Sequence, residues 1–207
     1  MTNPLAWFRR LRHADAWIFG TMLFSASLSL LASFVLSVDA IRLAKNPNLE
    51  LSCNINAVIS CGTVAESWQA QLFGFPNAFL GLIAEPVVIT IAVAGLCGVR
   101  FPRGFMFAAQ LVYTLGVIFA YWLFYQAVVN IGALCPWCLV ITVSTTLVFA
   151  TLTHVNIRDD NLYLPAGVQR AAARFIDADY DVVVVTIWLL VLALIIVSKY
   201  GAALFGG

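Results

Sequence analysis

The sequence predicts an all-α integral membrane protein in which four transmembrane helices form a bundle and a fifth transmembrane helix follows. Of its 207 residues, 62% are hydrophobic and only 10% are charged, whereas about 25% are charged in an average soluble domain. Five apolar segments reach the length of about 20 residues that a helix needs to cross a bilayer. With a net charge of +1, the chain has no overall field that would attract nucleic acid, and we expect no nucleic-acid partner.

The first apolar segment lacks the small-residue cleavage site of a signal peptide and is followed by further spans, so we expect it to be retained as a helix. The second, third and fourth spans are joined by links of only a few residues. Such short links make neighbouring helices antiparallel and favour a packed bundle. The predicted spans are residues 17–38, 77–99, 104–129, 136–153 and 182–198.

These spans divide the chain into three predicted parts. Residues 1–155 form the four-helix bundle, whose first two helices are joined by an outer loop over residues 39–76. Residues 156–181 form a cytoplasmic or interfacial loop, in which residues 164–181 are expected to be a short helix lying in the membrane interface. Residues 182–207 form the fifth helix and a short outer tail.

The distribution of basic residues sets the predicted orientation, because loops rich in arginine and lysine stay in the cytoplasm. One side of the spans has eight basic residues and the other has three. We therefore expect the N-terminus and the 154–181 loop in the cytoplasm, and the 39–76 loop, the 130–134 turn and the C-terminus outside. The cytoplasmic set is Arg9, Arg10, Arg12, Arg100, Arg103, Arg158, Arg170 and Arg174, and the outer set is Arg42, Lys45 and Lys199.

The most informative motif is Cys135-Pro136-Trp137-Cys138, at the point where a short turn meets the fourth span. Proline at the first helical position places both thiols at a helix N-terminus, where the dipole and the free N–H groups favour a thiolate. A disulfide within this motif closes almost no chain, so it adds little stability, and bonds of that kind are usually labile and catalytic. The motif therefore predicts a redox-active dithiol at the outer membrane surface.

Two further cysteines, Cys53 and Cys61, lie in the predicted outer loop, so all four thiols fall on the side where disulfides can form. In a straight helix the Cα atoms of Cys53 and Cys61 would be about 12 Å apart, whereas a disulfide tolerates about 7 Å. A bond between them therefore excludes a continuous helix and predicts a loop whose shape depends on its redox state. Cys97, near the inner end of the second span, is interpreted as a packing residue.

Three interpretations of the four thiols are open from the residues alone. In the first, the loop pair exchanges disulfides with the pair at the fourth span. In the second, two fixed disulfides brace a structural membrane subunit. In the third, cysteines bind a metal or haem, although the seven residues between Cys53 and Cys61 exceed the roughly two to four of a usual zinc knuckle.

Four segments in a fixed order carry a resemblance to a known family. They are Cys53-x7-Cys61, Ser67-Trp68, Phe73-Gly74-x-Pro76-Asn77-x-x-x-Gly81 and Cys135-x-x-Cys138. In this set the chain resembles the vitamin K epoxide reductase family, and its bacterial members in particular, over residues 15–155. The resemblance implies a four-helix bundle around a quinone pocket, with the outer loop forming a half-helix and a cap.

The resemblance also implies a role for each cysteine. Cys53 would take electrons from a reduced partner protein through a mixed disulfide, and Cys61 would pass them to Cys135. Cys138 would face the quinone and reduce it, although the helix dipole acts on both thiols of that pair and favours Cys135. We expect no metal in this chemistry.

Further positions match the pocket of the family. Asn77 would hydrogen-bond a quinone carbonyl, on which negative charge grows during reduction, with a cap on the helix after Pro76 as the alternative. Ser67 would support cysteine exchange, with an exposed loop hydroxyl as the alternative. Thr142 stands where the animal enzymes have a tyrosine that contacts the quinone. The bacterial members reduce respiratory quinones rather than an epoxide, and the resemblance implies the same substrate here.

Glu85 is the one acidic residue inside a predicted span, and an acid there is costly enough to indicate a functional role. It lies about 12 Å below Pro76 along the helix axis, where it would hydrogen-bond the quinone or deliver a proton. The alternative is an interhelical hydrogen bond, for instance with Gln110 or Tyr113.

The predicted function is that of a membrane thiol:quinone oxidoreductase, a disulfide-forming quinone reductase. It would reoxidise a DsbA-like thioredoxin-fold oxidase and reduce a membrane quinone, either menaquinone, ubiquinone or a vitamin K-like compound. Because only nine residues follow the fifth span, the donor is expected to be a separate extracytoplasmic protein. The expected location is the plasma (inner) membrane of a bacterium, with the cysteines on the periplasmic side of the lipid bilayer.

Overall fold

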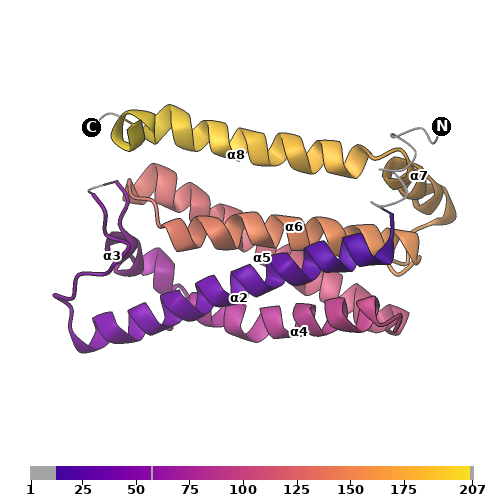
Figure 1. The fold of residues 1–207 in the computed structure, drawn as a ribbon, viewed down its shortest axis with the longest axis horizontal. Helices are drawn as coiled ribbons and strands as arrows, with labels where there is room; N and C mark the ends of the chain where they lie inside the picture. Colours follow the sequence, from indigo (N-terminus) through magenta and orange to yellow (C-terminus); the bar gives the residue numbers. More distant parts are fainter. Residues whose placement is uncertain (1–12, 57, 206–207) are drawn as a thin grey trace.

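The computed structural model of the chain describes residues 13–56 and 58–205, and in this part of the chain every regular element is a helix (Figure 1). Four long helices pack as a bundle and the last helix runs along its outside. The elements are α2 (Asp15–Lys45), α3 (Cys61–Ala65), the 3-10 turn η1 (Trp68–Gln71), α4 (Ala78–Leu96), α5 (Arg103–Gln126), the π-helical turn η2 (Ala127–Ile131), α6 (Pro136–Arg158), α7 (Ala166–Asp177) and α8 (Tyr180–Phe205).

The predicted spans are confirmed, because the described residues contain five helices long and apolar enough to cross a membrane. Some of these helices extend beyond the hydrophobic segments that predicted them. α2 continues to Lys45 and α6 to Arg158, because a helix satisfies its own backbone hydrogen bonds and does not have to stop where the apolar residues stop. The segment between α2 and α4, predicted as the outer loop, therefore begins at residue 46 rather than at residue 39.

The core of the bundle lies between α2, α4, α5 and α6, with α2 in contact with both α4 and α6. Glycines let α2 and α4 approach closely, since a Cβ atom at Gly81 would overlap Ser33 and one at Gly95 would overlap Phe19. In hydrocarbon, such close packing is a main source of helix association. The buried apolar side chains of this core include Ile18, Met22, Ala26, Val88, Ile91, Ala92, Met106, Val117, Val148 and Leu152.

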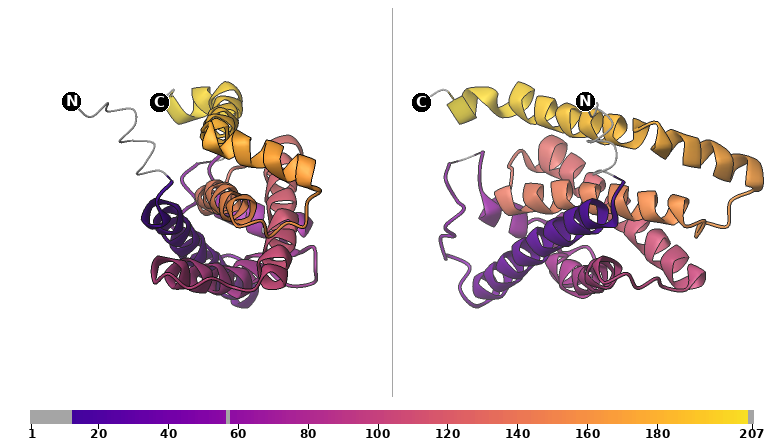
Figure 2. Two further views of the ribbon diagram at one scale, coloured as in Figure 1. Left: turned by 90° about the vertical axis from the view of Figure 1, so that its right-hand side faces the viewer. Right: turned by 45° about the vertical axis from the view of Figure 1, so that its right-hand side comes forward.

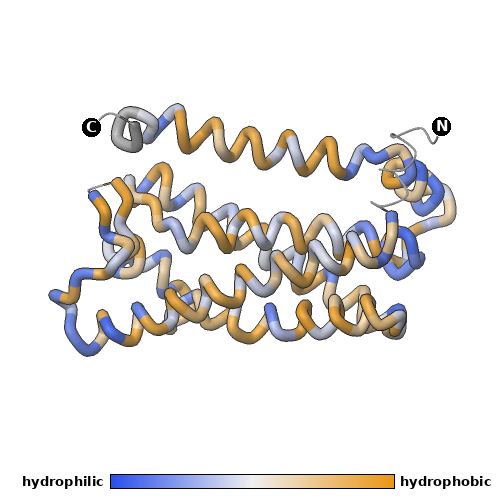
Figure 3. Tube along the Cα trace, viewed as in Figure 1, coloured by the Kyte–Doolittle hydropathy of each residue, from blue (hydrophilic) through white to orange (hydrophobic). Residues whose placement is uncertain are grey.

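Helix α8 packs against the bundle at few places. Figure 2 shows α8 outside the bundle in two further views, and Figure 3 shows hydrophobic residues along most of its length. Side chains such as Leu190 and Leu194 are exposed and would face lipid tails in a membrane. One contact to the bundle joins the rings of Trp188 and Tyr121, whose centroids are 5.2 Å apart.

Basic residues predicted for the cytoplasmic side gather at the end of the bundle that carries α7. Arg158 contacts Asp15 at 2.6 Å and Asp159 at 3.0 Å, and Arg100 pairs with Asp159 as well. Arg103 is paired with an acidic residue too, Asp160. These ion pairs join the ends of α2, α5 and α6 that lie near α7.

The predicted interfacial helix is present as α7, which is shorter than expected at both ends. Arg170 and Arg174 are exposed on it, while Ile176 is buried. The remaining arginines of the predicted cytoplasmic set, Arg9, Arg10 and Arg12, lie outside the described residues.

Candidate functional site: two cysteine pairs above an apolar cavity

The segment between α2 and α4, predicted to lie outside the membrane, carries a disulfide between Cys53 and Cys61, whose Cα atoms are 5.6 Å apart. The chain between them is a loop, as the disulfide geometry predicted. The side chain of Asn54 closes this loop by accepting hydrogen bonds from Ser60 Oγ at 3.1 Å and from Gly62 N–H at 2.9 Å. Ser60 then caps α3, which starts at Cys61.

The second pair lies at the start of α6. Cys135 is the N-cap residue, Pro136 follows at the first helical position, and the Cys138 N–H donates to Cys135 Sγ at 3.3 Å. A hydrogen bond from the Cys138 thiol lowers the pKa of Cys135, and the N–H groups of Cys138 and Trp137 act in the same direction against the effect of burial. Cys135 is therefore the thiol of this pair that the helix start favours as a thiolate, as the dipole predicted.

The two pairs meet through Cys61 and Cys135, whose sulfur atoms are 3.4 Å apart and buried. A short parallel backbone bridge aligns them. Leu134 N–H donates to Val58 O at 2.7 Å, and Ser60 N–H donates to Leu134 O at 3.0 Å. Reacting atoms held about 3–3.5 Å apart are in near-attack geometry, so a thiolate at either position can attack a disulfide that includes the other.

A cavity of about 510 Å³ lies beneath the cysteines, and its wall is mostly apolar. This volume is in the range of pockets that hold small organic ligands. Its lining includes every predicted site residue except Cys53, namely Cys61, Ser67, Asn77, Glu85, Cys135, Cys138 and Thr142.

The cavity also reaches the lipid-facing side of the bundle. Ile83 of α4 and Val112 and Leu115 of α5 belong to its wall, and each is at least 60% exposed. An apolar compound dissolved in the bilayer would therefore meet the cavity from the side, without crossing water.

Asn77 stands at the N-cap position of α4 but makes no side-chain cap bond. Its Nδ2 donates to Gln69 O at 2.6 Å, while its Oδ1 is buried with no hydrogen-bond partner among the described residues. A buried acceptor without a partner is costly, and the second hydrogen of Nδ2 is also available. The amide can thus donate to a quinone carbonyl or accept from a quinol hydroxyl.

The hydroxyl groups of the two other predicted polar residues bond to the backbone. Ser67 Oγ donates to Val64 O at 2.6 Å, across the turn that follows α3. Thr142 Oγ1 donates to Cys138 O at 2.9 Å, one helical turn earlier in α6. Both residues line the cavity, and both hydroxyls also stabilise segments that carry a cysteine.

Glu85 is buried in the wall of the cavity. Ser29 Oγ donates to its carboxyl group at 2.7 Å, and Tyr113 OH donates at 3.2 Å. The predicted interhelical hydrogen bond is therefore present with Tyr113. It is absent with Gln110, which bonds Thr153 and Asn156 because it lies on the face of α5 that packs on α6.

Sequence reasoning missed the part that α2 plays in this site. Serines recur at every fourth position of α2, and all of them are buried: Ser25, Ser29, Ser33 and Ser37. This spacing places them on one face of a helix, and that regularity is the signal that could have identified the face of α2 that includes Ser29 as a polar face within the bundle.

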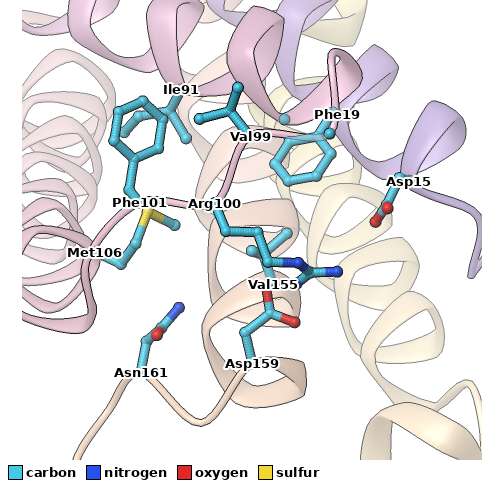
Figure 4. A pocket seen from close by; sticks show the side chains of 12 residues that line it. Asp15, Phe19, Ile91, Val99, Arg100, Phe101, Met106, Val155, Asp159 and Asn161 are labelled. Carbon is cyan, nitrogen blue, oxygen red and sulfur yellow. Dashed lines mark hydrogen bonds and ion pairs between the residues drawn. The ribbon is translucent and has the colours of Figure 1, made fainter.

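A second, smaller cavity of about 240 Å³ lies at the opposite end of the bundle. Figure 4 shows residues that line it, among them the apolar side chains of Phe19, Ile91 and Met106 and the paired side chains of Arg100 and Asp159. None of its lining residues is a cysteine. Cys97 is exposed and does not join the other thiols.

Among the described residues, no group of three or more histidine, cysteine or acidic side chains is placed to hold a metal ion. The interpretation of the thiols as ligands of a metal therefore gains no support from the structure.

A comparison with protein-family models agrees with the arrangement of the site. No curated protein matched the chain. The model of the vitamin K epoxide reductase family matches residues 21–153, which is more than half of the chain and includes all four cysteines of the site. The chain therefore belongs to the vitamin K epoxide reductase family and is a multi-pass membrane oxidoreductase that works through cysteine redox chemistry.

Proposed function

We propose that the protein oxidises a reduced thioredoxin-fold protein on the outer face of a bacterial plasma membrane and transfers the electrons to a membrane quinone. The observation that carries this proposal is the 3.4 Å separation of Cys61 and Cys135 at the roof of an apolar cavity. This separation supports a route for thiol exchange directly above a pocket that would hold a lipid-soluble acceptor. We assign catalysis to the 1–155 bundle, with the N-terminus in the cytoplasm.

Cys53 and Cys61, the outer pair, take the electrons first. A thiolate of the reduced partner attacks Cys53 and releases Cys61 as a thiol, and the second thiol of the partner then releases Cys53 and leaves the partner oxidised. Cys61 attacks Cys135 in the Cys135–Cys138 disulfide and frees Cys138. Cys53 then attacks Cys61, which restores the outer disulfide and leaves the inner pair as a dithiol.

Cys135 and Cys138, the inner pair, then transfer two electrons and two protons to the quinone, which becomes a quinol. The two cysteines return to a disulfide. The net reaction converts one partner dithiol and one quinone to one partner disulfide and one quinol. The structure has the outer disulfide formed and Cys135 and Cys138 free. In the proposed cycle, this combination corresponds to the state before reduction of the quinone.

The cavity offers polar groups for the head group of the quinone. Asn77 supplies a buried amide oxygen that has no hydrogen-bond partner among the described residues. Glu85, held by Ser29 and Tyr113, supplies a second polar contact lower in the cavity and a site for a proton. No lysine, arginine or histidine lines this cavity, and a carboxylate buried without a counter-ion is costly. We therefore assign the protonated form to Glu85 in this state.

Ser67 and Thr142 act beside these residues. Ser67 secures the turn after α3 and so supports the position of Cys61 during exchange. Thr142 borders the head group with a smaller side chain than tyrosine, which leaves room for the ring of a respiratory quinone such as menaquinone or ubiquinone.

The test is a steady-state assay with the full chain in lipid nanodiscs, a reduced DsbA-like donor and a membrane quinone. Quinol should form at the rate at which the donor is oxidised. Cys138→Ala should abolish quinol formation, while Cys97→Ala, which changes the thiol remote from the site, should leave it unchanged. Quinol formation that persists in Cys138→Ala would overturn the proposal.

A further inference from the structure

We propose that the outer end of α8 positions the cysteines for exchange, with Tyr200 and Lys199 holding the turn that aligns Cys61 with Cys135. The inference rests on the proposed function, since it concerns the step between those two sulfurs. Neither residue touches the sulfurs, so both are positioning residues that act through Val128.

The first link is the carbonyl of Val128 in the π-helical turn η2. This turn closes with a bond from Gly132 N–H to Ala127 O at 2.9 Å, and Gly132 has a φ of 76° that favours glycine. Carbonyls in the last turn of a helix lack partners within the helix. The Lys199 ammonium and the Tyr200 hydroxyl both donate to Val128 O, and a cation is favourable at a helix C-terminus.

The second link is the packing of the Tyr200 ring. Most of α8 is exposed, but Tyr200 is only 5% exposed. It forms a buried cluster with Val128 and Leu134, against which Val58 of the outer loop also packs. The outer end of α8 therefore belongs to a cluster that includes residues from both segments that lead to the reacting cysteines.

The third link is the backbone bridge between those segments. Leu134 makes both of its hydrogen bonds, to Val58 and to Ser60, and Leu134 and Ser60 each directly precede a reacting cysteine. A shift of Leu134 would therefore change the distance between the sulfurs of Cys61 and Cys135. A misplacement of about 1 Å can cost on the order of 100-fold in rate, so the packing beneath Leu134 matters for exchange.

The experiment measures the positioning directly, without quinone or donor. In a Cys53→Ala/Cys97→Ser/Cys138→Ala background, only Cys61 and Cys135 remain. The fraction of protein with a Cys61–Cys135 disulfide, at equilibrium with a glutathione buffer, gives the effective concentration of one thiol at the other. Tyr200→Leu removes the ring and the hydroxyl, Tyr200→Phe keeps the ring, and Lys199→Met removes the cation. Leu194→Ala, at a lipid-facing position that is 66% exposed, is the matched control.

We expect Tyr200→Leu to lower the effective concentration about tenfold, with smaller losses for Lys199→Met and Tyr200→Phe and none for Leu194→Ala. Melting curves identify folded samples, and Lys199→Met keeps the test valid if Tyr200→Leu does not fold. An unchanged value in both Tyr200→Leu and Lys199→Met would overturn the role of α8 and leave the proposed function standing. If the background variant itself never forms the Cys61–Cys135 disulfide, the proposed relay fails, and this inference fails with it.

Discussion

The sulfur of Cys135 lies at the first turn of α6, where it accepts a hydrogen bond from the Cys138 N–H. It is 3.4 Å from the sulfur of Cys61. The hydrogen bond from the Cys138 thiol lowers the pKa of Cys135, so its thiolate persists at pH values where an ordinary thiol is protonated. Because the folded-state pKa is the lower one, this interaction stabilises the fold above the pKa of an ordinary thiol, about 8.5. That contribution is lost as the pH falls through the folded-state value.

We therefore expect the ultraviolet absorbance of the Cys135 thiolate to titrate below the range of an ordinary thiol, in protein with the outer disulfide formed. Cys138→Ala removes the thiol donor and should move the midpoint to higher pH. The Cys135→Ser protein identifies the part of the absorbance that belongs to this sulfur. A midpoint that does not move in Cys138→Ala contradicts the assigned cause.

Glu85 was predicted either to serve the quinone or to make an interhelical hydrogen bond, and one carboxyl group can do both. Its carboxyl group accepts from Ser29 and Tyr113, which a purely structural acid would also do, yet it lines the cavity. Gln at this position keeps the size and polarity but cannot give up a proton. We expect Glu85→Gln to slow quinol formation about 100-fold, the lower range of general acid catalysis, as followed by rapid mixing.

The donor-side reaction is the internal reference for this variant. Oxidation of a single equivalent of reduced donor by the outer disulfide should be unchanged in Glu85→Gln. If Glu85→Gln and the parent protein form quinol at the same rate, the acid has a structural role only.

The sequence predicted the helical elements well, because each span meets its own backbone hydrogen bonds and is revealed by hydropathy alone. It did not predict the π-helical turn at residues 127–131, since a change from i→i+4 to i→i+5 bonding leaves no mark in composition. The partnership of Ser29 with Glu85 was missed for another reason: it depends on which faces of α2 and α4 meet. The four cysteines were found because their chemistry is local to two short motifs.

The contact between α2 and α4 depends on small residues. A Cβ atom at Gly81 would overlap Ser33, while one at Gly20 would meet no atom within 4 Å. We expect Gly81→Ala to destabilise the protein by about 1–3 kcal/mol, as overpacking does, and to lower the melting temperature in detergent. Gly20→Ala, the matched change on α2, should not lower it, and adding Ser33→Ala to Gly81→Ala should restore part of the loss. Equal melting temperatures for the two glycine variants would contradict the tight contact.

At the scale of the whole molecule, the bundle separates two environments. Its cysteine end brings together the Cys53–Cys61 disulfide and the free thiols of Cys135 and Cys138. Its other end is held by ion pairs around Arg158 and Arg100. Between them, the main cavity reaches the lipid-facing side near Val112 and Leu115. This arrangement would allow a protein substrate to reach the cysteines at one end and a lipid-soluble substrate to enter the cavity from the side of the bundle.

A larger side chain can narrow the opening of the main cavity toward the lipid without changing the cysteines. We expect Val112→Trp to lower kcat/KM for a long-tailed membrane quinone roughly threefold to tenfold, because slower access lowers the association rate. A short-chain quinone should be affected less. Leu194→Trp on α8, which does not line the cavity, is the control. Equal losses for both quinones would indicate damage to the pocket rather than to the lateral opening.

The most direct measurement is the reaction of excess reduced donor with the Cys138→Ala protein in the presence of quinone, with thiols and quinol counted together. The outer disulfide should oxidise one equivalent of donor and the reaction should then stop, with no quinol formed, whereas the parent protein should continue with one quinol for each donor disulfide. Quinol formed by Cys138→Ala, or a donor that the outer disulfide never oxidises, would contradict the transfer of electrons from the outer pair through Cys135 and Cys138 to the quinone.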